Sequence, residues 1–406
     1  MSRSAGCRTW TCVVALLAAA GAIAGPHDDV PYRLAPGVFD TGRPDLGLQP
    51  AAGTRSVTVF APSDDASRFN NGVVLMPFRG RLYAQWQSSA RDEDSADTRV
   101  LYSWSDDGLH WQPPQVLRAA GRDGVMHSNG GWWTDGDTLV AYINVWPDGF
   151  QSRAGGWTEA MTSRDGANWS TLQRVRDADG APVEGVIEQD PRALPDGRIV
   201  TAFHLRPGMH VAPFVTDDPL GLRGWRRGHM DSAPSDDPRV SRALEPSTFQ
   251  RRREGRDCVV MVFRDQASSF RQLASESCDG GLRWTPPTVT GMPDARAKQS
   301  AGNLPDGTAF LVNAPNAERE RIPLAVTLSS DGDTFDRAFL LRGRSDLPTL
   351  RHAGRYKRPG YHYPKSVLWG AHLYVAYAVN KEDIALTRVP VRSLVAPPAP
   401  VTRDID

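Results

Sequence analysis

The sequence predicts an all-β fold, a six-bladed β-propeller in which a strand from the N-terminal part of the chain closes the last blade. Three observations predict it. A short phrase, Ser-x-Asp-Gly followed by an aromatic residue, recurs with a period of roughly 50–60 residues, as expected of one stacked structural unit. Short apolar or alternating segments lie between turn residues, which is typical of β-strands. No segment has the apolar pattern of a long amphipathic helix.

The repeated phrase marks each unit. Asp-Gly between apolar flanks is a hairpin signal, because glycine supplies the positive φ that a tight turn requires. The aspartate can accept hydrogen bonds from backbone N–H groups, and the aromatic ring can anchor the turn to the core. We therefore expect the phrase to report the fold and not to contact substrate. It occupies 105–111, 163–169, 277–284 and 329–335, with a degenerate copy at 216–221.

Each unit divides into four predicted strands, and the phrase falls between the third and the fourth. The first unit comprises 71–77, 81–87, 99–104 and 112–118, and the second 130–133, 138–145, 158–162 and 170–175. The third comprises 189–194, 198–204, 210–215 and 225–229, and the fourth 245–251, 258–264, 272–276 and 285–290. The fifth comprises 298–304, 309–313, 322–328 and 337–341.

The last unit has only three predicted strands, at 363–368, 372–379 and 384–389. Segment 56–60 reads as a spare strand with no partner nearby in the sequence. If it supplied the fourth strand, the ring would close and no sheet edge would remain open. A seven-bladed ring is the alternative, but the sequence contains no seventh unit.

The N-terminus resembles a targeting segment. Arg3 and Arg8 precede an apolar run that ends in Ala22-Ile-Ala24, the small-x-small form of a signal peptidase site. We expect a signal peptide at 1–24, a Pro/Gly-rich linker or surface wrap at 25–54, the propeller at 55–395 and a tail at 396–406. The protein would then be exported, periplasmic or secreted. An uncleaved anchor is the alternative, although the run is short for a spanning helix.

Charge excludes two classes of partner. The chain has 47 Lys and Arg against 47 Asp and Glu, so no net field attracts nucleic acid or an anionic membrane. We expect no nucleic-acid partner and no stable membrane insertion. An acidic ligand would need a local cluster of cations.

Two cysteines, Cys258 and Cys278, follow the predicted cleavage site. A hairpin that sets Arg264 opposite Arg271 would bring them close enough for a disulfide, which an exported protein can form. Two buried free thiols are the alternative.

Propeller geometry directs the starts of first strands and the ends of second strands toward a central funnel. The residues at these positions are largely polar or charged, whereas positions that only fill a core would be apolar, and this favours a polar ligand site. Three histidines in this set, His127, His204 and His362, do not have the spacing of a metal site, and we expect neither metal nor cofactor.

The chain resembles the sialidase (neuraminidase) family, whose members carry such aspartate boxes on a six-bladed propeller, over roughly residues 56–392. Leu244-Glu245-Pro246-Ser247 resembles the segment that carries the family's catalytic glutamate. Val260–Arg264 resembles the strand that carries its second arginine. Arg321–Ser329 resembles the segment that leads from its third arginine into an aspartate box. Gly360–Tyr363 resembles the segment that carries its tyrosine nucleophile. The family's first-strand Arg-Ile-Pro is replaced here by Arg68-Phe69-Asn70.

The resemblance implies a role for each matched residue. Tyr363 would be the nucleophile, Glu245 its activating base and Asp92 the acid/base, with Asp94 and Asp97 as alternatives. A neutral phenol avoids the repulsion that an anionic nucleophile would meet at a carbon bearing a carboxylate. Guanidinium groups bind a carboxylate through paired hydrogen bonds. The expected substrate-binding residues are Arg68, Arg264, Arg321, His127, Gln189, His204, Tyr361 and Lys365.

The sequence thus favours an exported exo-glycosidase that removes a terminal acidic sugar, of the sialic acid type, from a glycan or glycoconjugate with retention. A propeller polysaccharide lyase that acts on uronates is a second interpretation, with His or Tyr as the base. A glycan-binding propeller without turnover is a third, because one fold supports many functions.

Overall fold

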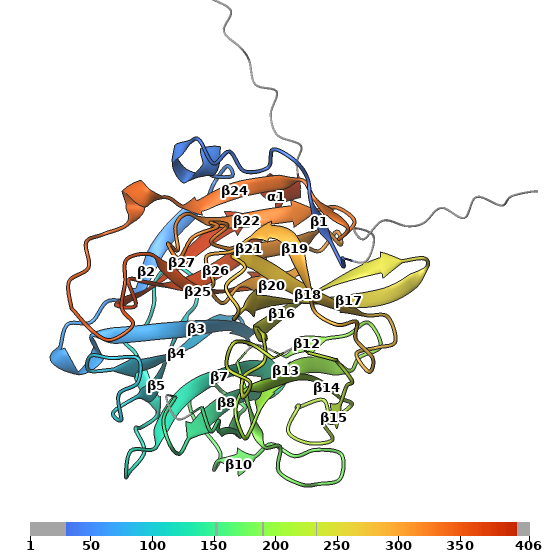
Figure 1. Cartoon of the computed structure of the whole chain (residues 1–406). Helices are drawn as coiled ribbons and strands as arrows, with labels where there is room; N and C mark the ends of the chain where they lie inside the picture. Colours follow the sequence, from blue (N-terminus) through green and yellow to red (C-terminus); the bar gives the residue numbers. More distant parts are fainter. Residues whose placement is uncertain (1–29, 151–152, 189–190, 233, 396–406) are drawn as a thin grey trace, which may run out of the picture.

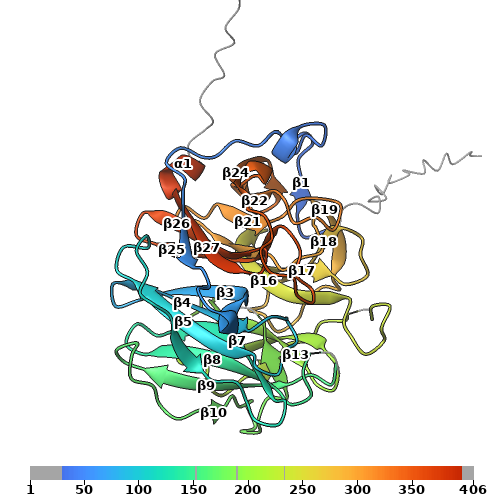
Figure 2. The same cartoon turned by 90° about the vertical axis from the view of Figure 1, so that its left-hand side faces the viewer.

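A computed structural model describes residues 30–150, 153–188, 191–232 and 234–395. Six antiparallel sheets surround a common axis, as Figures 1 and 2 show, which confirms the predicted six-bladed β-propeller. The predicted signal peptide and C-terminal tail lie outside the described residues. Within the described residues, no helix is long and apolar enough to span a membrane.

The blades follow one another along the chain, each with its first strand next to the axis. Blade I contains β3 (Phe69–Phe78), β4 (Arg81–Ser89), β5 (Arg99–Ser105) and β6 (Gln115–Arg118). Blade II contains β7 (Met126–Thr134), β8 (Leu139–Trp146), β9 (Trp157–Ser163) and β10 (Gln173–Arg174). Blade III contains β11 (Gly185–Ile187), β12 (Arg192–Ala193), β13 (Ile199–Leu205), β14 (His210–Thr216) and β15 (Arg226–Arg227). Its first strand is therefore in two pieces, where the sequence predicts one strand at 189–194.

Blade IV contains β16 (Ala243–Arg253), β17 (Arg256–Asp265), β18 (Arg271–Ser277) and β19 (Thr288–Pro293). Blade V contains β20 (Ser300–Asn303), β21 (Ala309–Asn313), β22 (Leu324–Ser329) and β24 (Arg337–Arg342). Blade VI contains β25 (Tyr361–Trp369), β26 (His372–Val379), β27 (Asp383–Pro390) and, at its outer edge, β2 (Arg55–Phe60). Strand β2 pairs antiparallel with β27, so the predicted closure by the N-terminal strand is confirmed.

Several short elements lie outside the four-stranded pattern of the blades. They are β1 (Arg33–Leu34), β23 (Thr334–Phe335), the 3-10 helices η1 (Pro44–Gly47), η2 (Asp65–Ser67) and η3 (Arg344–Asp346), and the helix α1 (Val391–Val395).

The apolar core lies between the blades. Six clusters of buried side chains each join one blade to the next around the ring, and the cluster between blades VI and I completes the circle. Burial of apolar surface between neighbouring sheets is thus the main force that holds the ring together.

The repeated phrase forms the expected turn in each blade. In blade II, the Asp165 carboxylate accepts hydrogen bonds from the backbone of Ala167 and Asn168, and Ser163 Oγ accepts one from Gly166. Gly166 has a φ of 73°, and a Cβ there would overlap the hydroxyl of Tyr83 in blade I. The phrase therefore contributes to packing between blades as well as to the turn.

The N-terminal segment lies along the outer edge of blade V, where both views place it beside β24 (Figures 1 and 2). Strand β1 pairs with β23, and the Leu340 backbone N–H donates to Gln49. The ring of Tyr32 is buried between Phe249 and Phe335, and its hydroxyl donates to Gln272 Oε1 at 2.7 Å. Residues 30–54 are thus anchored to blades IV and V.

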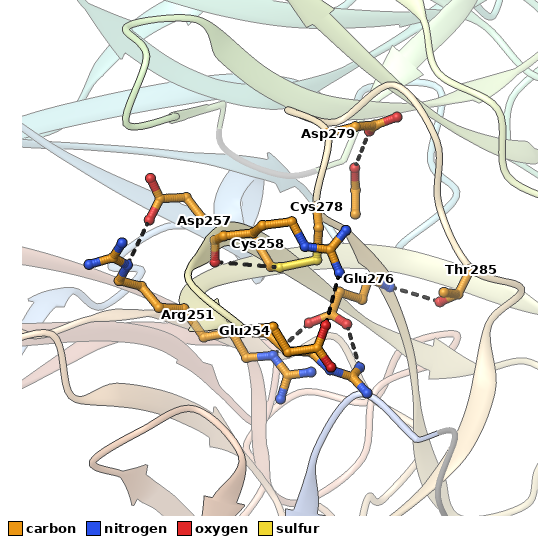
Figure 3. Close-up of a disulfide and its surroundings, with 12 residues drawn as sticks. Arg251, Glu254, Asp257, Cys258, Glu276, Cys278, Asp279 and Thr285 are labelled. Carbon is orange, nitrogen blue, oxygen red and sulfur yellow. Dashed lines mark hydrogen bonds and ion pairs between the residues drawn. A yellow bond between two sulfur atoms is a disulfide. The ribbon is translucent and has the colours of Figure 1, made fainter.

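Cys258 and Cys278 form a disulfide across β17 and β18, with 4.1 Å between their Cα atoms (Figure 3). The register differs by one residue from the predicted hairpin, because Arg264 pairs with Gln272 and not with Arg271. The loop between the two strands fixes this register. The conformation of that loop could not be predicted from the sequence.

Candidate active site

A cavity of about 480 Å³ opens at the axis, where the inner strands begin. Its walls come from all six blades. Its apolar lining residues are Val74, Trp146, Phe150 and Met209. The charged or ionisable groups are Glu93, Asp94, Arg153, Glu188, Glu245, Lys298, Tyr363 and Lys365, and Tyr356 also contributes to the wall.

Glu245 and Tyr363 occupy equivalent places in blades IV and VI. Each sits in a β-bulge of the innermost strand, where the register shifts between Leu244 and Ser247 and between His362 and Lys365. Each adopts a positive φ, 55° for Glu245 and 52° for Tyr363, and each precedes a proline. A bulge redirects a side chain out of the regular alternation. Both side chains line the cavity.

Two buried side chains hold the Glu245 backbone in its unfavourable conformation. His204 Nε2 accepts a hydrogen bond from the Glu245 N–H at 3.1 Å, and Gln299 Nε2 donates to the Glu245 carbonyl at 2.8 Å. His204 comes from blade III and Gln299 from blade V, so both neighbouring blades fix blade IV. His204 is therefore a positioning residue and does not line the cavity.

The Glu245 carboxylate faces several cations. Burial alone would raise its pKa, but the positive charges of Arg264, Lys298 and Arg321 outweigh burial and lower the pKa to about 2. Arg264 Nη1 donates to Glu245 Oε2 at 3.1 Å. Glu245 is consequently ionised at neutral pH. Lys298 Nζ also lies 2.6 Å from Glu188 Oε2, which partly neutralises this side of the cavity.

The ring of Tyr363 is surrounded by cations. Lys298 Nζ lies 5.2 Å, Arg321 Cζ 4.9 Å and Lys381 Nζ 5.3 Å from its centroid. Among the described residues, no hydrogen bond joins the Tyr363 hydroxyl to Glu245 or to another group. The two side chains predicted as nucleophile and base thus line one cavity but are not hydrogen-bonded to each other in this structure.

Arg321 is buried beneath this tyrosine, with a relative exposure of 1%. Its Nη1 donates to His362 Nδ1 at 2.9 Å, and its Nη2 donates to the Arg296 carbonyl at 3.1 Å. The other nitrogen of His362, Nε2, lies 3.0 Å from the Arg358 carbonyl and donates to it, because Nδ1 must accept from a guanidinium. Burial and the charge of Arg321 keep the pKa of His362 well below its ordinary value.

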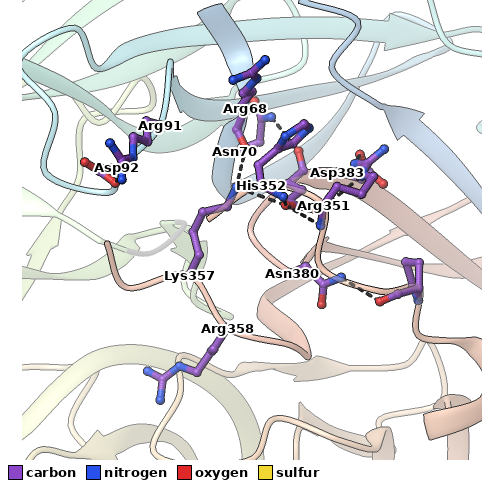
Figure 4. Close-up of polar contacts among 12 residues, drawn as sticks. Arg68, Asn70, Arg91, Asp92, Arg351, His352, Lys357, Arg358, Asn380 and Asp383 are labelled. Atoms are coloured by element: carbon purple, nitrogen blue, oxygen red, sulfur yellow. Dashed lines mark hydrogen bonds and ion pairs between the residues drawn. The ribbon is translucent and has the colours of Figure 1, made fainter. Parts of the chain in front are cut away.

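Arg358 is a guanidinium that the sequence prediction missed. Its side chain extends away from the contacts around Lys357 (Figure 4). Its guanidinium forms no ion pair or hydrogen bond with any described residue. Burial, and then the positive charges of Arg321 and Arg264, lower its pKa. Its signal in the sequence is the basic run Arg355-Tyr-Lys-Arg358, three residues before the tyrosine strand.

The loop between β4 and β5 carries the three candidate acids. Asp92 Oδ1 accepts a hydrogen bond from the Arg355 backbone N–H at 2.6 Å, and Asp97 Oδ2 accepts one from Ala90 at 2.7 Å. Both carboxylates are engaged with loop backbone and lie outside the cavity wall. Asp94 lines the cavity. The spacing argument that favoured Asp92 could not detect which way each side chain turns.

Arg68 and Tyr361 do not reach the cavity wall. Arg68 follows η2 and forms an ion pair with Asp65. Tyr361 is buried against Tyr377, and its hydroxyl donates to the Gly343 carbonyl at 2.8 Å. Local partners set the direction of both side chains. The resemblance to the family could not predict these partners.

Of the remaining predicted residues, Lys365 lines the cavity. His127 is buried and hydrogen-bonded through Nδ1 to the Ala119 carbonyl at 2.7 Å, whereas its neighbours Ser128 and Asn129 line the wall. Gln189 lies outside the described residues.

Comparison with known proteins places this arrangement in a family. Residues 80–375 match the family model described as a BNR repeat-like domain. No curated protein matches the chain. Among solved structures, a sialidase is 18% identical with a TM-score of 0.62, and the match covers 89% of this chain but only 35% of the sialidase.

Two further structures match over nearly their whole length. A protein of unknown function from Dyadobacter fermentans is 16% identical with a TM-score of 0.62, covering 84% of this chain and 99% of that one. The intramolecular trans-sialidase from Ruminococcus gnavus is 12% identical with a TM-score of 0.61, covering 87% and 100%. Identities this low show the fold alone. The family match covers most of the chain, so the chain belongs to the BNR repeat-like domain family, and the solved structures show that it shares the propeller fold of these sialidases.

Proposed function

We propose that the protein is an exported exo-glycosidase that hydrolyses a terminal acidic sugar, of the sialic acid type, with retention of configuration. The observation that carries the proposal is the pair Glu245 and Tyr363, both held at positive φ on inner-strand bulges at one cation-rich cavity. Backbone conformations of this kind cost free energy and concentrate at functional sites.

The first chemical step would form a bond between the Tyr363 oxygen and the anomeric carbon. Glu245 would take the phenolic proton, and the bond to the leaving oxygen would break as that oxygen receives a proton from an acid. We assign the acid to Asp94 in place of Asp92, because Asp94 lines the cavity whereas Asp92 is bonded to the Arg355 backbone. In the second step Asp94 would take a proton from water, the water oxygen would bond to the anomeric carbon as its bond to the Tyr363 oxygen breaks, and Glu245 would return its proton to that oxygen.

Because of the charges around Glu245, the carboxylate of an acidic substrate would also affect how strongly Glu245 acts as a base. The cations that lower its pKa to about 2 also make it a weak base in the empty site. A bound carboxylate would offset part of that positive field and so strengthen Glu245 as a base. A neutral sugar would not, which favours acidic substrates beyond simple attraction.

The disulfide and the N-terminal segment support export, because disulfides persist in oxidising compartments. Recovery of the mature protein outside the cytoplasm, with Gly25 as its first residue, would test this part.

The reaction is tested by incubating the protein with a panel of acidic glycosides and weighing the products. Hydrolysis adds the mass of water, whereas a lyase leaves an unsaturated sugar. None of the three histidines that could act as a lyase base lines the cavity. Release of an unsaturated product, or binding without any product, would contradict the proposal.

The acid assignment has its own test. D94N should lower kcat/KM by about 100-fold or more, in the range for loss of a general acid. The loss should shrink with a nitrophenyl leaving group, which departs without a proton. D92N is the matched control, because an asparagine oxygen can still accept from Arg355. A larger loss in D92N than in D94N would return the role to Asp92.

A further inference from the structure

Tyr356 is an exposed aromatic residue at the cavity. Its relative exposure is 52%, and only one other large hydrophobic residue in the described parts of the chain, Val116, is as exposed. It also lines the same cavity as Tyr363 and Glu245. Its backbone adopts a φ of 61°, which is unfavourable for a bulky residue. A ring held open to solvent by a costly backbone suggests a ligand for its face.

The loop that carries Tyr356 is firmly held. The ammonium of Lys357 is fully buried, 3.2 Å from Glu382 Oε1, and it also donates to the Arg68 carbonyl at 2.9 Å. The same Glu382 carboxylate accepts the backbone N–H groups of Arg351 and His352. Figure 4 shows the Lys357 side chain directed toward Arg68 and toward the segment of Arg351 and His352. Tyr356 is therefore presented by an ordered segment, which lowers the entropy cost of stacking a ligand on it.

The loop is also joined to the segment that carries the candidate acid. The Arg355 N–H donates to Asp92, two residues before Asp94. Because the acid must lie beside the leaving oxygen, the leaving group departs on the side of this segment. Tyr356 thus stands on the leaving-group side of the bond that breaks.

We propose that Tyr356 forms a subsite for the sugar ring next to the terminal acidic sugar, by stacking its face on the apolar C–H face of that pyranose. This inference rests on the proposed function, since the side of the cavity is defined by the acid. The side chain suits the task because an aromatic ring offers a large apolar face at little conformational cost. Arg355, 5.4 Å from the ring centroid, covers part of the ring and helps to fix it.

The test compares substrates that share the terminal acidic sugar and differ in the leaving group. One carries methanol and the other a disaccharide, and kcat/KM is measured for the wild type, Y356A and Y356F. Y356A should lose about 3- to 10-fold more with the disaccharide substrate than with the methyl glycoside, the range of an aromatic contact. Y356F keeps the ring and should restore most of that loss. Thermal unfolding of each variant separates these effects from misfolding.

The outcomes are distinct. Equal losses on both substrates, or no loss on either, would overturn the subsite while leaving the hydrolase in place. Loss in Y356F as large as in Y356A would assign the effect to the hydroxyl and overturn stacking. If the wild type releases sugar from neither substrate, the proposed function fails, and the subsite fails with it.

Discussion

Glu245 and Tyr363 illustrate how single residues define this site. Each lies at a β-bulge in the inner strand of its blade, and each adopts a left-handed backbone conformation immediately before a proline. The equivalent bulge of blade I carries Gly72, also at positive φ. The repeat thus places the same bulged backbone conformation in several blades. Glycine occupies the position where no side chain is needed, and a functional residue occupies it where a side chain is needed.

Arg358 is a residue that the resemblance to the family did not predict. The first arginine expected from the resemblance, Arg68, pairs with Asp65 outside the cavity. Arg358 is half-buried among like charges and has no ion pair within the described residues, so a carboxylate would relieve the repulsion. We expect R358A to weaken binding of an acidic sugar by about 1.5–3 kcal/mol, the range for a hydrogen bond to a charged group.

The matched control is R68A, which removes a guanidinium of the same charge from outside the cavity. Calorimetric binding of the acidic sugar and of its uncharged amide would compare the two. R358A should weaken binding of the acidic sugar much more than binding of its amide. R68A should weaken binding of neither ligand. An R68A loss equal to that of R358A would indicate a general electrostatic effect and exclude a specific contact.

At the scale of elements, the repeated turn is a packing device between blades. Its glycine lies against the preceding blade in each copy: Gly108 on Tyr374, Gly166 on Tyr83, Gly221 on Tyr142, Gly281 on Val215 and Gly332 on Arg251. The copy in blade III lacks the usual sequence, yet Asp218 Oδ2 still accepts the Leu222 N–H at 2.8 Å. The contact has been kept where the motif has degenerated.

G166A tests this packing. Both Gly166 and Gly180 have positive φ, 73° and 81°, so alanine at either position meets the same backbone penalty. Only at Gly166 would the added methyl overlap Tyr83, whereas Gly180 has open space. Overpacking of this kind costs roughly 1–3 kcal/mol. Denaturant unfolding should therefore show that G166A is less stable than G180A by about that amount. Equal stability of the two variants would mean that blade II can shift to accommodate the added methyl group without cost.

The elements were largely predictable, and the reasons are physical. Hydrophobic alternation and Asp-Gly turns are local properties, so the four-strand units and the closing strand 56–60 follow from the sequence. Bulges and side-chain directions depend on neighbouring blades. For this reason the sequence predicts Glu245 and Tyr363 at one cavity but not the pairing of Arg68 with Asp65, the inward turn of Asp94 or the broken first strand of blade III.

At the scale of the whole molecule, ring closure joins the residues of the site. Glu245 depends on His204 from blade III and on Gln299 from blade V. Tyr363 lies beside Arg321, which comes from the segment between β21 and β22 of blade V. None of these pairs is close in sequence. Because every blade is packed between two others, loosening one interface disturbs the site as well as the fold.

Buried histidines should make the stability of this ring depend on pH. His204 and His362 are both fully buried, and burial lowers the pKa of each. Unfolded histidine has a pKa of about 6.5, so below that pH the unfolded chain binds protons that the folded chain refuses, and stability falls as pH falls. For His362, acidification from about pH 7.5 to 5.5 should remove about 1.4 kcal/mol. Asp294, whose pKa burial raises to about 6, works in the opposite direction and partly offsets this below pH 6.

H362Q isolates this contribution. A glutamine can accept from Arg321 through Oε1 and donate to the Arg358 carbonyl through Nε2, so it can replace both hydrogen bonds without titrating. Urea unfolding, followed by tryptophan fluorescence at several pH values, should give a shallower decline between pH 6.5 and 5.5 for H362Q than for the wild type. Parallel declines would mean that His362 takes up its proton in the folded ring, and therefore that the bond from Arg321 opens without loss of the fold.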